Sequence, residues 1–280
     1  MCRWVGYFGQ PIRPEELLYE PEHSLIAQSQ ASEFYENGLN GDGLGLGWYG
    51  QRAEPGIYRN AAPAWGDNNL REIAAQVESR LFLAHIRAAT GSPVQETNCH
   101  PFRYGRWLFV HNGYVADFNT IHRELLLAVN PELFNNIRGS TDSELLFHLA
   151  LTFGLEDDPL GALEQMAGFV EEVAARHRIP NPLQMTLGVS DGEHLYGIRY
   201  ASGTKQANTL FVSENIDAVR TLYPERERLR HFAGDARTIV SEPLVKLHGA
   251  WREVPVASAL VVQAGNLDVR PFRPRAPARA

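Results

Sequence analysis

The sequence predicts an α+β domain in which helices cover the sheets. Short apolar runs typical of strands recur through the first 111 residues, helical periodicity dominates residues 118–178, and strand patterns then return. Separate blocks of strands and helices are typical of this class. A chain of 280 residues has ample material for a buried core. The order of the segments leaves open whether two sheets stack.

In the first part of the chain, short apolar and aromatic runs predict strands. These are residues 3–8, 44–49, 57–60, 81–88 and 107–111. In residues 44–49, glycine alternates with bulky apolar residues, which suits a strand packed closely against other backbone. Two helices are expected between these strands, at residues 22–30 and 68–77, and the second has its apolar positions on one helical face.

The middle of the chain predicts three helices, at residues 118–129, 142–153 and 160–178. Ser140 or Thr141 is placed to cap the second of them. The last part predicts strands again, at residues 185–190, 195–200, 209–213, 238–240 and 257–263. The charged segment 213–236 predicts loop and short helix. We expect one domain over residues 1–270 and a flexible tail over residues 271–280, which are rich in Pro, Arg and Ala.

The composition argues against several classes of partner. A formal net charge of -7 argues against a nucleic-acid binder, which needs a basic surface to neutralise phosphates. No apolar stretch approaches the length of a membrane helix, and the N-terminus lacks the apolar core of a signal peptide. The two cysteines, Cys2 and Cys99, could form a disulfide, but nothing in the sequence indicates an oxidising compartment. We expect a reduced, cytoplasmic protein.

Cys2 directly follows the initiator Met1 and is small enough for routine removal of that methionine. Removal would leave the thiol beside a free α-amino group, whose usual pKa of roughly 7.7–8.0 suits it to take the thiol proton near neutral pH. Cys2 is therefore a candidate nucleophile. The alternative is a small apolar residue at the start of an edge strand, and the position alone favours that alternative.

His111, Asn112 and Gly113 end the apolar run that begins at Trp107. The Asn112 amide and the Gly113 backbone N–H could supply two hydrogen-bond donors to a developing oxyanion. Asn-Gly is also the favoured pair of a type I′ hairpin turn, so a turn is the alternative.

Arg87 and Asp142 are candidates for binding the charges of a substrate. Arg87 emerges where the buried run 81–86 ends, and a buried arginine needs a carboxylate, either from the protein or from a substrate. Asp142 opens a helix, where it could complement the helix dipole or accept hydrogen bonds from a substrate ammonium. Together the two residues would form a two-point clamp for an amino acid.

Two other groups of residues do not indicate a cofactor-binding or metal-binding site. The glycine-rich residues 41–47 lack the spacing of a dinucleotide-binding fingerprint. Cys99 and His100, with His85 and His111 nearby in the sequence, show no metal-ligand spacing. We therefore expect neither a metal ion nor another cofactor.

Taken together, the candidate residues resemble the class II glutamine amidotransferases of the N-terminal nucleophile superfamily. The matching pieces, in chain order, are Met1-Cys2, the glycine-rich residues 41–49, Arg87-x-x-Thr90, Asn98-Cys99-His100-Pro101-Phe102, His111-Asn112-Gly113 and Thr141-Asp142-Ser143-Glu144. Each piece is weak alone, but their joint occurrence in this order is specific and covers roughly the first half of the chain. The opening residues 1–9 and the later Ser241-Glu242-Pro243-Leu244 look closest to a stand-alone branch that includes the γ-glutamyl amidohydrolases of ergothioneine synthesis.

The resemblance implies a four-layer αββα fold with two antiparallel sheets packed together. It also implies that Cys2 attacks the γ-carbonyl of a glutamine-like substrate, while Asn112 and the Gly113 N–H hold the oxyanion. Arg87 would bind the α-carboxylate and Asp142 the α-ammonium. The lesser candidates for lining the pocket are Thr90 and His111.

The implied reaction is hydrolysis of the γ-amide of glutamine or a γ-glutamyl compound through a γ-glutamyl thioester, with release of glutamate and ammonia or an amine. The familiar large members carry a second synthase domain, for which 280 residues leave no room, so an ammonia acceptor would be a separate protein. The alternatives are an ammonia-supplying subunit for a separate synthase and a non-catalytic glutamine-binding regulatory protein. If Met1 stays attached, the α-amino base is lost and this mechanism fails.

Overall fold

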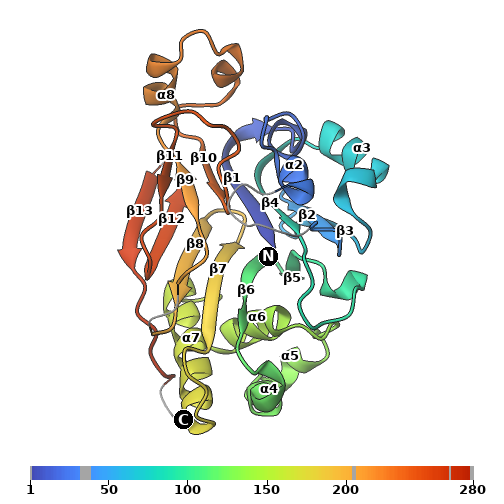
Figure 1. Cartoon of the computed structure of the whole chain (residues 1–280), viewed down its shortest axis with the longest axis vertical. Coiled ribbons are helices and arrows are strands. Elements are labelled where there is room, and N and C mark those ends of the chain that lie inside the picture. The colour runs from blue at the N-terminus through green and yellow to red at the C-terminus, as the bar shows by residue number, and fades with distance from the viewer. Residues whose placement is uncertain (1, 32–38, 204–205, 265, 278–280) are drawn as a thin grey trace.

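Two antiparallel sheets stack face to face, and helices cover the outer face of each (Figure 1). The computed structural model describes residues 2–31, 39–203, 206–264 and 266–277. The structure confirms the expected α+β fold with four αββα layers. It also shows that the strands form two sheets, which the sequence had left open.

The first sheet has seven strands in the order β11-β9-β10-β1-β4-β2-β3. Its strands are β1 (Arg3–Ile12), β2 (Leu44–Trp48), β3 (Gly56–Asn60), β4 (Ser79–Ile86), β9 (Phe211–Ser213), β10 (Arg237–Val240) and β11 (Trp251–Glu253). The second sheet has six strands in the order β13-β12-β8-β7-β6-β5. Its strands are β5 (Phe102–Tyr104), β6 (Trp107–Val115), β7 (Leu183–Ser190), β8 (Leu195–Ala201), β12 (Ser258–Gln263) and β13 (Asn266–Pro271).

Seven of the helices form two groups on opposite outer faces (Figure 1). Those on the first sheet are α1 (Glu15–Leu18), α2 (Leu25–Gln30) and α3 (Asn68–Gln76). Those on the second sheet are α4 (Phe118–Leu127), α5 (Pro131–Phe134), α6 (Asp142–Thr152) and α7 (Pro159–Arg176). A third group, α8 (Ile216–Leu222) and the 3-10 segment η3 (Glu227–His231), lies apart at the top of Figure 1.

Three hydrophobic clusters separate these layers, and strand β1 shows how one segment contributes to two of them. Val5 and Tyr7 belong to the cluster under α1 to α3, whereas Trp4 and Phe8 belong to the cluster between the sheets. Successive side chains of a strand point to opposite faces, so a strand buried on both faces has an uninterrupted apolar sequence. The third cluster joins α4 to α7 to the second sheet.

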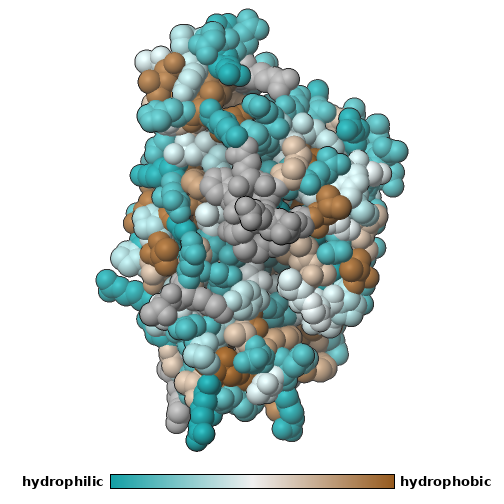
Figure 2. Space-filling model, in the orientation of Figure 1, coloured by the Kyte–Doolittle hydropathy of each residue, from teal (hydrophilic) through white to brown (hydrophobic). Residues whose placement is uncertain are grey.

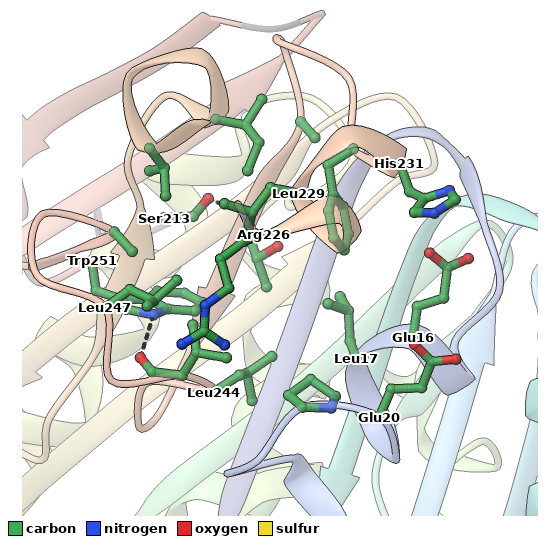
Figure 3. Close-up of a pocket in the computed structure, with 18 of the residues that line it drawn as sticks. Glu16, Leu17, Glu20, Ser213, Arg226, Leu229, His231, Leu244, Leu247 and Trp251 are labelled. Atoms are coloured by element: carbon green, nitrogen blue, oxygen red, sulfur yellow. Dashed lines mark hydrogen bonds between the residues drawn. The ribbon is translucent and has the colours of Figure 1, made fainter. Parts of the chain in front are cut away.

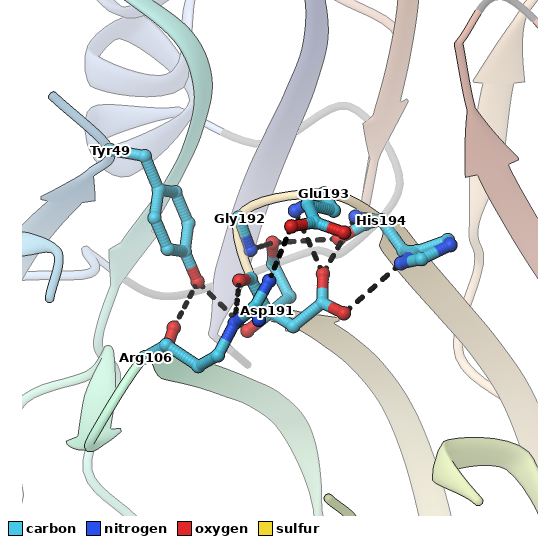
Figure 4. A network of polar contacts seen from close by, with 7 residues as sticks. Tyr49, Arg106, Asp191, Gly192, Glu193 and His194 are labelled. Atoms are coloured by element: carbon cyan, nitrogen blue, oxygen red, sulfur yellow. Dashed lines mark hydrogen bonds and ion pairs between the residues drawn. The ribbon is translucent and has the colours of Figure 1, made fainter. Parts of the chain in front are cut away.

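A polar network also links the two sheets (Figure 4). The Tyr49 hydroxyl, just after β2, lies 2.8 Å from the carbonyl oxygens of Arg106 and Ser190 and can donate its one proton to either of them. Arg106 donates to the carbonyl oxygen of Asp191 at 2.7 Å and pairs with Glu193 at 3.1 Å. Burial raises the pKa of Tyr49, so its hydroxyl remains a donor at neutral pH. The network therefore fixes the end of β2 against two turns of the second sheet.

Several elements differ from the sequence-based expectations. Strand β6 continues to Val115 instead of ending at residue 111, because β7 pairs with it along its length from Leu108 to Val115. Three edge strands, β5, β11 and β13, were not expected. Strands β5 and β11 have only three residues each, too few to show alternation. The helices α1 and α5, of four residues each, escaped the prediction for the same reason.

The end of the chain is packed against α7, in contrast to the flexible tail expected from residue 271. Strand β13 pairs with β12 up to Pro271, and Phe272 is 2% exposed within the cluster of the second sheet. The backbone N–H groups of Arg273 and Arg275 donate to Glu164 of α7. The composition rich in Pro and Arg is typical of flexible chain, but Phe272 anchors this segment to the core. The last part of the expected tail, residues 278–280, lies outside the described residues.

The face seen in Figure 2 is mainly hydrophilic, with apolar side chains scattered over it. Among the described helices, none combines the length and the hydrophobicity that a membrane span requires.

Candidate active site

The pairing of β1 with β4 places Cys2 beside the end of β4. Arg3 is opposite Ile86, so the preceding Cys2 lies against Ala88, with its Sγ 3.4 Å from the Ala88 nitrogen and 3.5 Å from the Ala88 oxygen. Burial raises the pKa of the Cys2 thiol, the Ala88 contact and Arg87 lower it, and Asp142 raises it. Arg87 and Asp142, which are 55 positions apart, therefore both lie close enough to act on this sulfur.

Asn112 and Gly113 lie inside strand β6, not in a hairpin turn. Asn112 is opposite Thr186 and Gly113 is opposite Met185 of β7. A Cβ at Gly113 would collide with the carbonyl oxygen of Gln184, so close backbone packing, not a turn, requires glycine here. The turn alternative is therefore wrong, and both residues lie in the part of β6 that pairs with β7.

Arg87 is 4% exposed, and its guanidinium is held by oxygen atoms of two loops. It donates to the carbonyl oxygen of Asp42 at 3.2 Å and to the Ser92 hydroxyl at 2.6 Å. Within the described part of the chain, it forms no ion pair with a carboxylate. A buried cation without a protein counter-charge is well suited to receive an anionic group of a ligand.

Asp142 is the first residue of α6, but Thr141 caps that helix through its hydroxyl, which accepts from the Glu144 N–H. The Asp142 carboxylate instead accepts from the Val115 N–H at 2.8 Å and from the Ser143 N–H at 2.7 Å. It therefore joins the end of β6 to the start of α6. Asp142 is partly exposed, and a carboxylate has capacity for further donors.

His111 and Thr90 differ in their environments. His111 is 1% exposed, its Nδ1 lies 2.8 Å from the Ser143 hydroxyl, and its Nε2 has no hydrogen-bond partner among the described residues. Thr90 is exposed in the loop after β4, and within the described chain no hydrogen bond joins it to the other candidates. The structure thus brings His111 to the site region through Ser143 and shows no such link for Thr90.

Two residues that the sequence-based list omitted form a buried ion pair next to Cys2. Arg3 Nε lies 2.6 Å from Glu242 Oε1, and both side chains are 3% exposed. Arg3 also donates to Asn40 Oδ1 at 2.7 Å. Ser241 accepts from the Trp4 N–H through its hydroxyl and donates its own N–H to the Trp4 carbonyl. The start of β1 is therefore fixed by the Ser241-Glu242 segment. In the sequence, this segment had contributed only to the family resemblance, and no role was assigned to it.

We predict that Glu242→Gln lowers the free energy of unfolding by about 3–5 kcal/mol, because it leaves the Arg3 guanidinium buried beside a neutral group. Urea unfolding of the two proteins measures the difference. Glu193→Gln is the matched control, since its ion pair with Arg106 is 67% and 44% exposed and should contribute at most about 1 kcal/mol. Equal, small losses in both variants would contradict the structural role of the buried pair.

A cavity of about 700 Å³ lies elsewhere, between α1 and the segment that carries α8 and η3 (Figure 3). Glu16 and Glu20 line one side of it, Arg226 projects into it, and Trp251 and Leu244 line another side. None of the candidate catalytic residues lines this cavity. The size of this cavity is therefore not evidence against an active site at Cys2. Within the described residues, no group of three or more His, Cys, Asp or Glu is arranged to hold a metal ion.

Comparison with known sequences finds one relative that matches nearly the whole chain and others that match part of it. The family described as class-II glutamine amidotransferases matches residues 29–209. A protein of Saccharomyces cerevisiae named probable glutamine amidotransferase DUG3 is 34% identical over 302 residues, which cover 97% of this chain and 84% of that protein. The γ-glutamyl-hercynylcysteine sulfoxide hydrolase of Mycobacterium tuberculosis is 38% identical over 117 residues, which cover 41% of this chain and 50% of that protein.

Solved structures agree with these sequence relatives. A glutamine aminotransferase class-II domain protein from Silicibacter pomeroyi superimposes with a TM-score of 0.72 at 32% identity, over 98% of this chain and 100% of that one. Glutamine phosphoribosylpyrophosphate amidotransferase from Bacillus subtilis superimposes with a TM-score of 0.63 at 15% identity, over 98% of this chain and 50% of that one. At that identity, the second similarity supports the fold alone.

Proposed function

Because this chain belongs to the class II glutamine amidotransferases, we propose that Cys2 hydrolyses the γ-amide of glutamine or of a γ-glutamyl compound through a γ-glutamyl thioester. The observation that carries the proposal is the position of the Cys2 thiol. It lies against Ala88 at the end of β4, and the charges of Arg87 and Asp142 both reach it. The thiol therefore lies within electrostatic reach of one cation and one anion, whose charges are complementary to the α-carboxylate and α-ammonium of a free amino acid.

The reaction needs a base, because burial raises the pKa of the thiol and keeps it protonated at rest. With Met1 removed, the α-amino group of Cys2 accepts the thiol proton as Sγ attacks the γ-carbonyl carbon. Asn112 and the Gly113 N–H would stabilise the oxyanion. Collapse of that intermediate breaks the C–N bond, and the α-ammonium gives its proton to the leaving amine. Water then attacks the thioester, gives a proton back to the same amine, and releases glutamate and the thiol.

The glutamyl part of the substrate would be held by its charges. Arg87 would bind the α-carboxylate, and it offers a buried guanidinium whose described partners are neutral oxygen atoms. Asp142 would bind the α-ammonium with the capacity that its backbone contacts leave. Thr90 and His111 remain proposed lining residues, and the Ser143 contact of His111 gives it the stronger support.

The identity of the leaving group decides whether the enzyme needs a partner protein. One relative is named as a probable glutamine amidotransferase and another as a γ-glutamyl-hercynylcysteine sulfoxide hydrolase, so the glutamyl end is the shared part of the substrates. If glutamine is the substrate, the released ammonia would be transferred to a separate synthase. A cytoplasmic location is supported by Cys2 and Cys99, which are both free thiols.

We predict that a diazo-ketone analogue of glutamine labels Cys2 once, on protein that lacks Met1. Mass spectrometry of the intact protein and of its N-terminal peptide would report processing and labelling together. Cys99 is the internal control, because it is buried and its thiol donates to the Asn60 carbonyl at 3.3 Å. Processed protein without an adduct would contradict a glutamyl pocket at Cys2.

A panel of substrates then separates the two forms of the proposal. Glutamate release from glutamine would be compared with release from γ-glutamyl amines and γ-glutamyl peptides of increasing size. Faster turnover of glutamine than of every larger amide supports an ammonia-supplying enzyme, and the reverse order supports a γ-glutamyl amidohydrolase.

A further inference from the structure

The Asn208 side chain, from the segment between β8 and β9, lies against the candidate oxyanion donor Asn112. Asn208 is 2% exposed, and its Nδ2 lies 3.3 Å from the Asn112 carbonyl oxygen and 3.5 Å from Asn112 Oδ1. The two residues are 96 positions apart, and Asn208 belongs to no motif. A buried amide in direct contact with a candidate catalytic amide is therefore unused by the reaction proposed above.

The Asn208 contact distinguishes the two ends of the Asn112 side chain. An amide has an oxygen that only accepts hydrogen bonds and a nitrogen that only donates them. Because Asn208 Nδ2 donates toward Asn112 Oδ1, the Asn112 NH2 group is directed elsewhere. Among the described residues none accepts a hydrogen bond from that NH2 group, so it is free to donate to a ligand. Rotation of the Asn112 amide by half a turn would place two NH2 groups face to face.

Asn208 is itself held in place from both sheets. Arg199 of β8, which is 7% exposed, donates from Nε to the Asn208 carbonyl at 2.8 Å. The same arginine pairs with Glu253 of β11 at 2.7 Å. The hydroxyl of the next residue, Thr209, donates to the Ser241 carbonyl at 2.9 Å. These contacts fix the Asn208 backbone, so its side chain presents a stationary donor.

We infer that Asn208 is a positioning residue that sets the orientation of the Asn112 amide, so that the Asn112 NH2 group faces the oxyanion formed during attack by Cys2. The inference rests on the proposed function. It assigns to the second half of the chain a part in the reaction, because the donor that acts on the substrate comes from β6 and the residue that orients it follows β8. Preorganised donors are effective in catalysis because they need no reorientation as charge develops.

The test is Asn208→Asp, which keeps the shape of the side chain and replaces its donor with an acceptor. An ionised carboxylate at this place would attract the Asn112 NH2 group and turn the amide away from the substrate. We expect kcat for glutamate release to fall by about 10²–10³-fold, the usual effect of losing one oxyanion donor, while KM changes by less than about threefold. Asn136→Asp, at an exposed position after α5, is the control for an added charge and should leave both constants unchanged.

A double-mutant cycle separates orientation from general disruption. If Asn208 acts through Asn112, then Asn208→Asp in an Asn112→Ala background should lower kcat by less than about threefold further. Losses that multiply in the double variant, or a wild-type kcat in Asn208→Asp, would overturn the inference. In both cases Cys2-dependent turnover by the wild-type protein would leave the proposed function intact.

An NMR measurement that needs no turnover tests the inference even if the proposed function is wrong. The side-chain NH2 resonances of Asn112, assigned by their loss in Asn112→Ala, should shift in Asn208→Asp and stay in place in Asn136→Asp. Unchanged Asn112 resonances in Asn208→Asp would show that the two amides do not interact, and the inference would then be wrong whatever the substrate.

Discussion

Replacement of Cys2 by alanine should lower γ-glutamyl amide hydrolysis by at least about 10⁴-fold and leave the fold intact. The large loss is expected because no other group can form the thioester, so only the binding and oxyanion contacts would remain to accelerate attack by water. The fold should survive because Cys2 precedes β1, is only partly buried and has Ala88 as its described hydrogen-bond partner. Initial rates of glutamate release, with circular dichroism on the same samples, measure both effects.

Cys99→Ala is the matched control for Cys2→Ala. Its thiol is fully buried, donates to the Asn60 carbonyl and packs against Gly43. Loss of that packing should reduce stability while kcat stays within a few-fold of the wild-type value. Cys2→Ala protein that keeps more than a tenth of the wild-type rate would remove Cys2 from the mechanism and would require another nucleophile.

The family and the fold could be predicted from the sequence because their signals are local. The resemblance drawn from short motifs to the class II glutamine amidotransferases is confirmed. Strand β1 has apolar residues on both faces and was predicted as a strand, and Arg87 stands where β4 ends, as its position after an apolar run indicated. These features depend on the side-chain period of a strand, which a single segment displays.

The extent of β6 could not be predicted in the same way. The apolar run ends at Val110, and Asn112-Gly113 is the pair that hairpin turns favour. The strand continues because β7 pairs with it as far as Val115, and a Cβ at position 113 would meet the backbone of Gln184. A polar Asn-Gly pair inside a strand thus contradicts local propensity, and such exceptions are expected where a site needs donors.

The supporting residues were beyond sequence reasoning because their partners are remote. Arg3 and Glu242 are 239 positions apart, and Asn208 is 96 positions from Asn112. Each of these residues alone resembles an ordinary surface residue, and burial of charges or amides becomes evident only when the partner is known. The list drawn from motifs therefore contained the residues that could touch substrate and omitted those that hold them.

The buried histidines around β6 lead to a second large effect, a loss of stability in mild acid. His85, His100, His111 and His148 are each at most 3% exposed. The rings of His85 and His100 lie 4.0 Å apart, and His85 Nε2 lies 3.2 Å from the His111 carbonyl oxygen. Burial lowers the pKa of His85 to about 3 and lowers the pKa of the other three below the usual value. His85 and His100, whose pKa values lie well below the usual one, are therefore neutral in the folded protein near pH 6.

The direction of the effect follows from proton binding. The unfolded chain takes up these protons as pH falls below about 6.5, and the folded protein does not. Stability is therefore complete above that pH and decreases below it. From pH 7.5 to pH 5.5, His85 and His100 should each remove about 1.4 kcal/mol, or about 3 kcal/mol together, from the free energy of unfolding. His111 and His148 should add to the loss in the same direction. Carboxylates, whose pKa values are usually roughly 3.9–4.3, stay ionised over this window, so they do not account for the loss.

Urea unfolding at pH 7.5 and at pH 5.5 measures the loss, and calorimetry in two buffers of different ionisation enthalpy counts the protons taken up on unfolding. His85→Gln should reduce the pH dependence by about 1.4 kcal/mol, the contribution of one histidine that takes up its proton in this window only when the chain is unfolded. The exposed His248 provides the control, and His248→Gln should leave the pH dependence unchanged. Uptake of less than one proton by the wild-type protein at pH 5.5 would mean that the buried histidines are already charged in the fold. Such a charge next to His111 would also place a cation beside the strand that carries Asn112 and Gly113, so the same measurement tests whether β6 is neutral where the oxyanion is proposed to form.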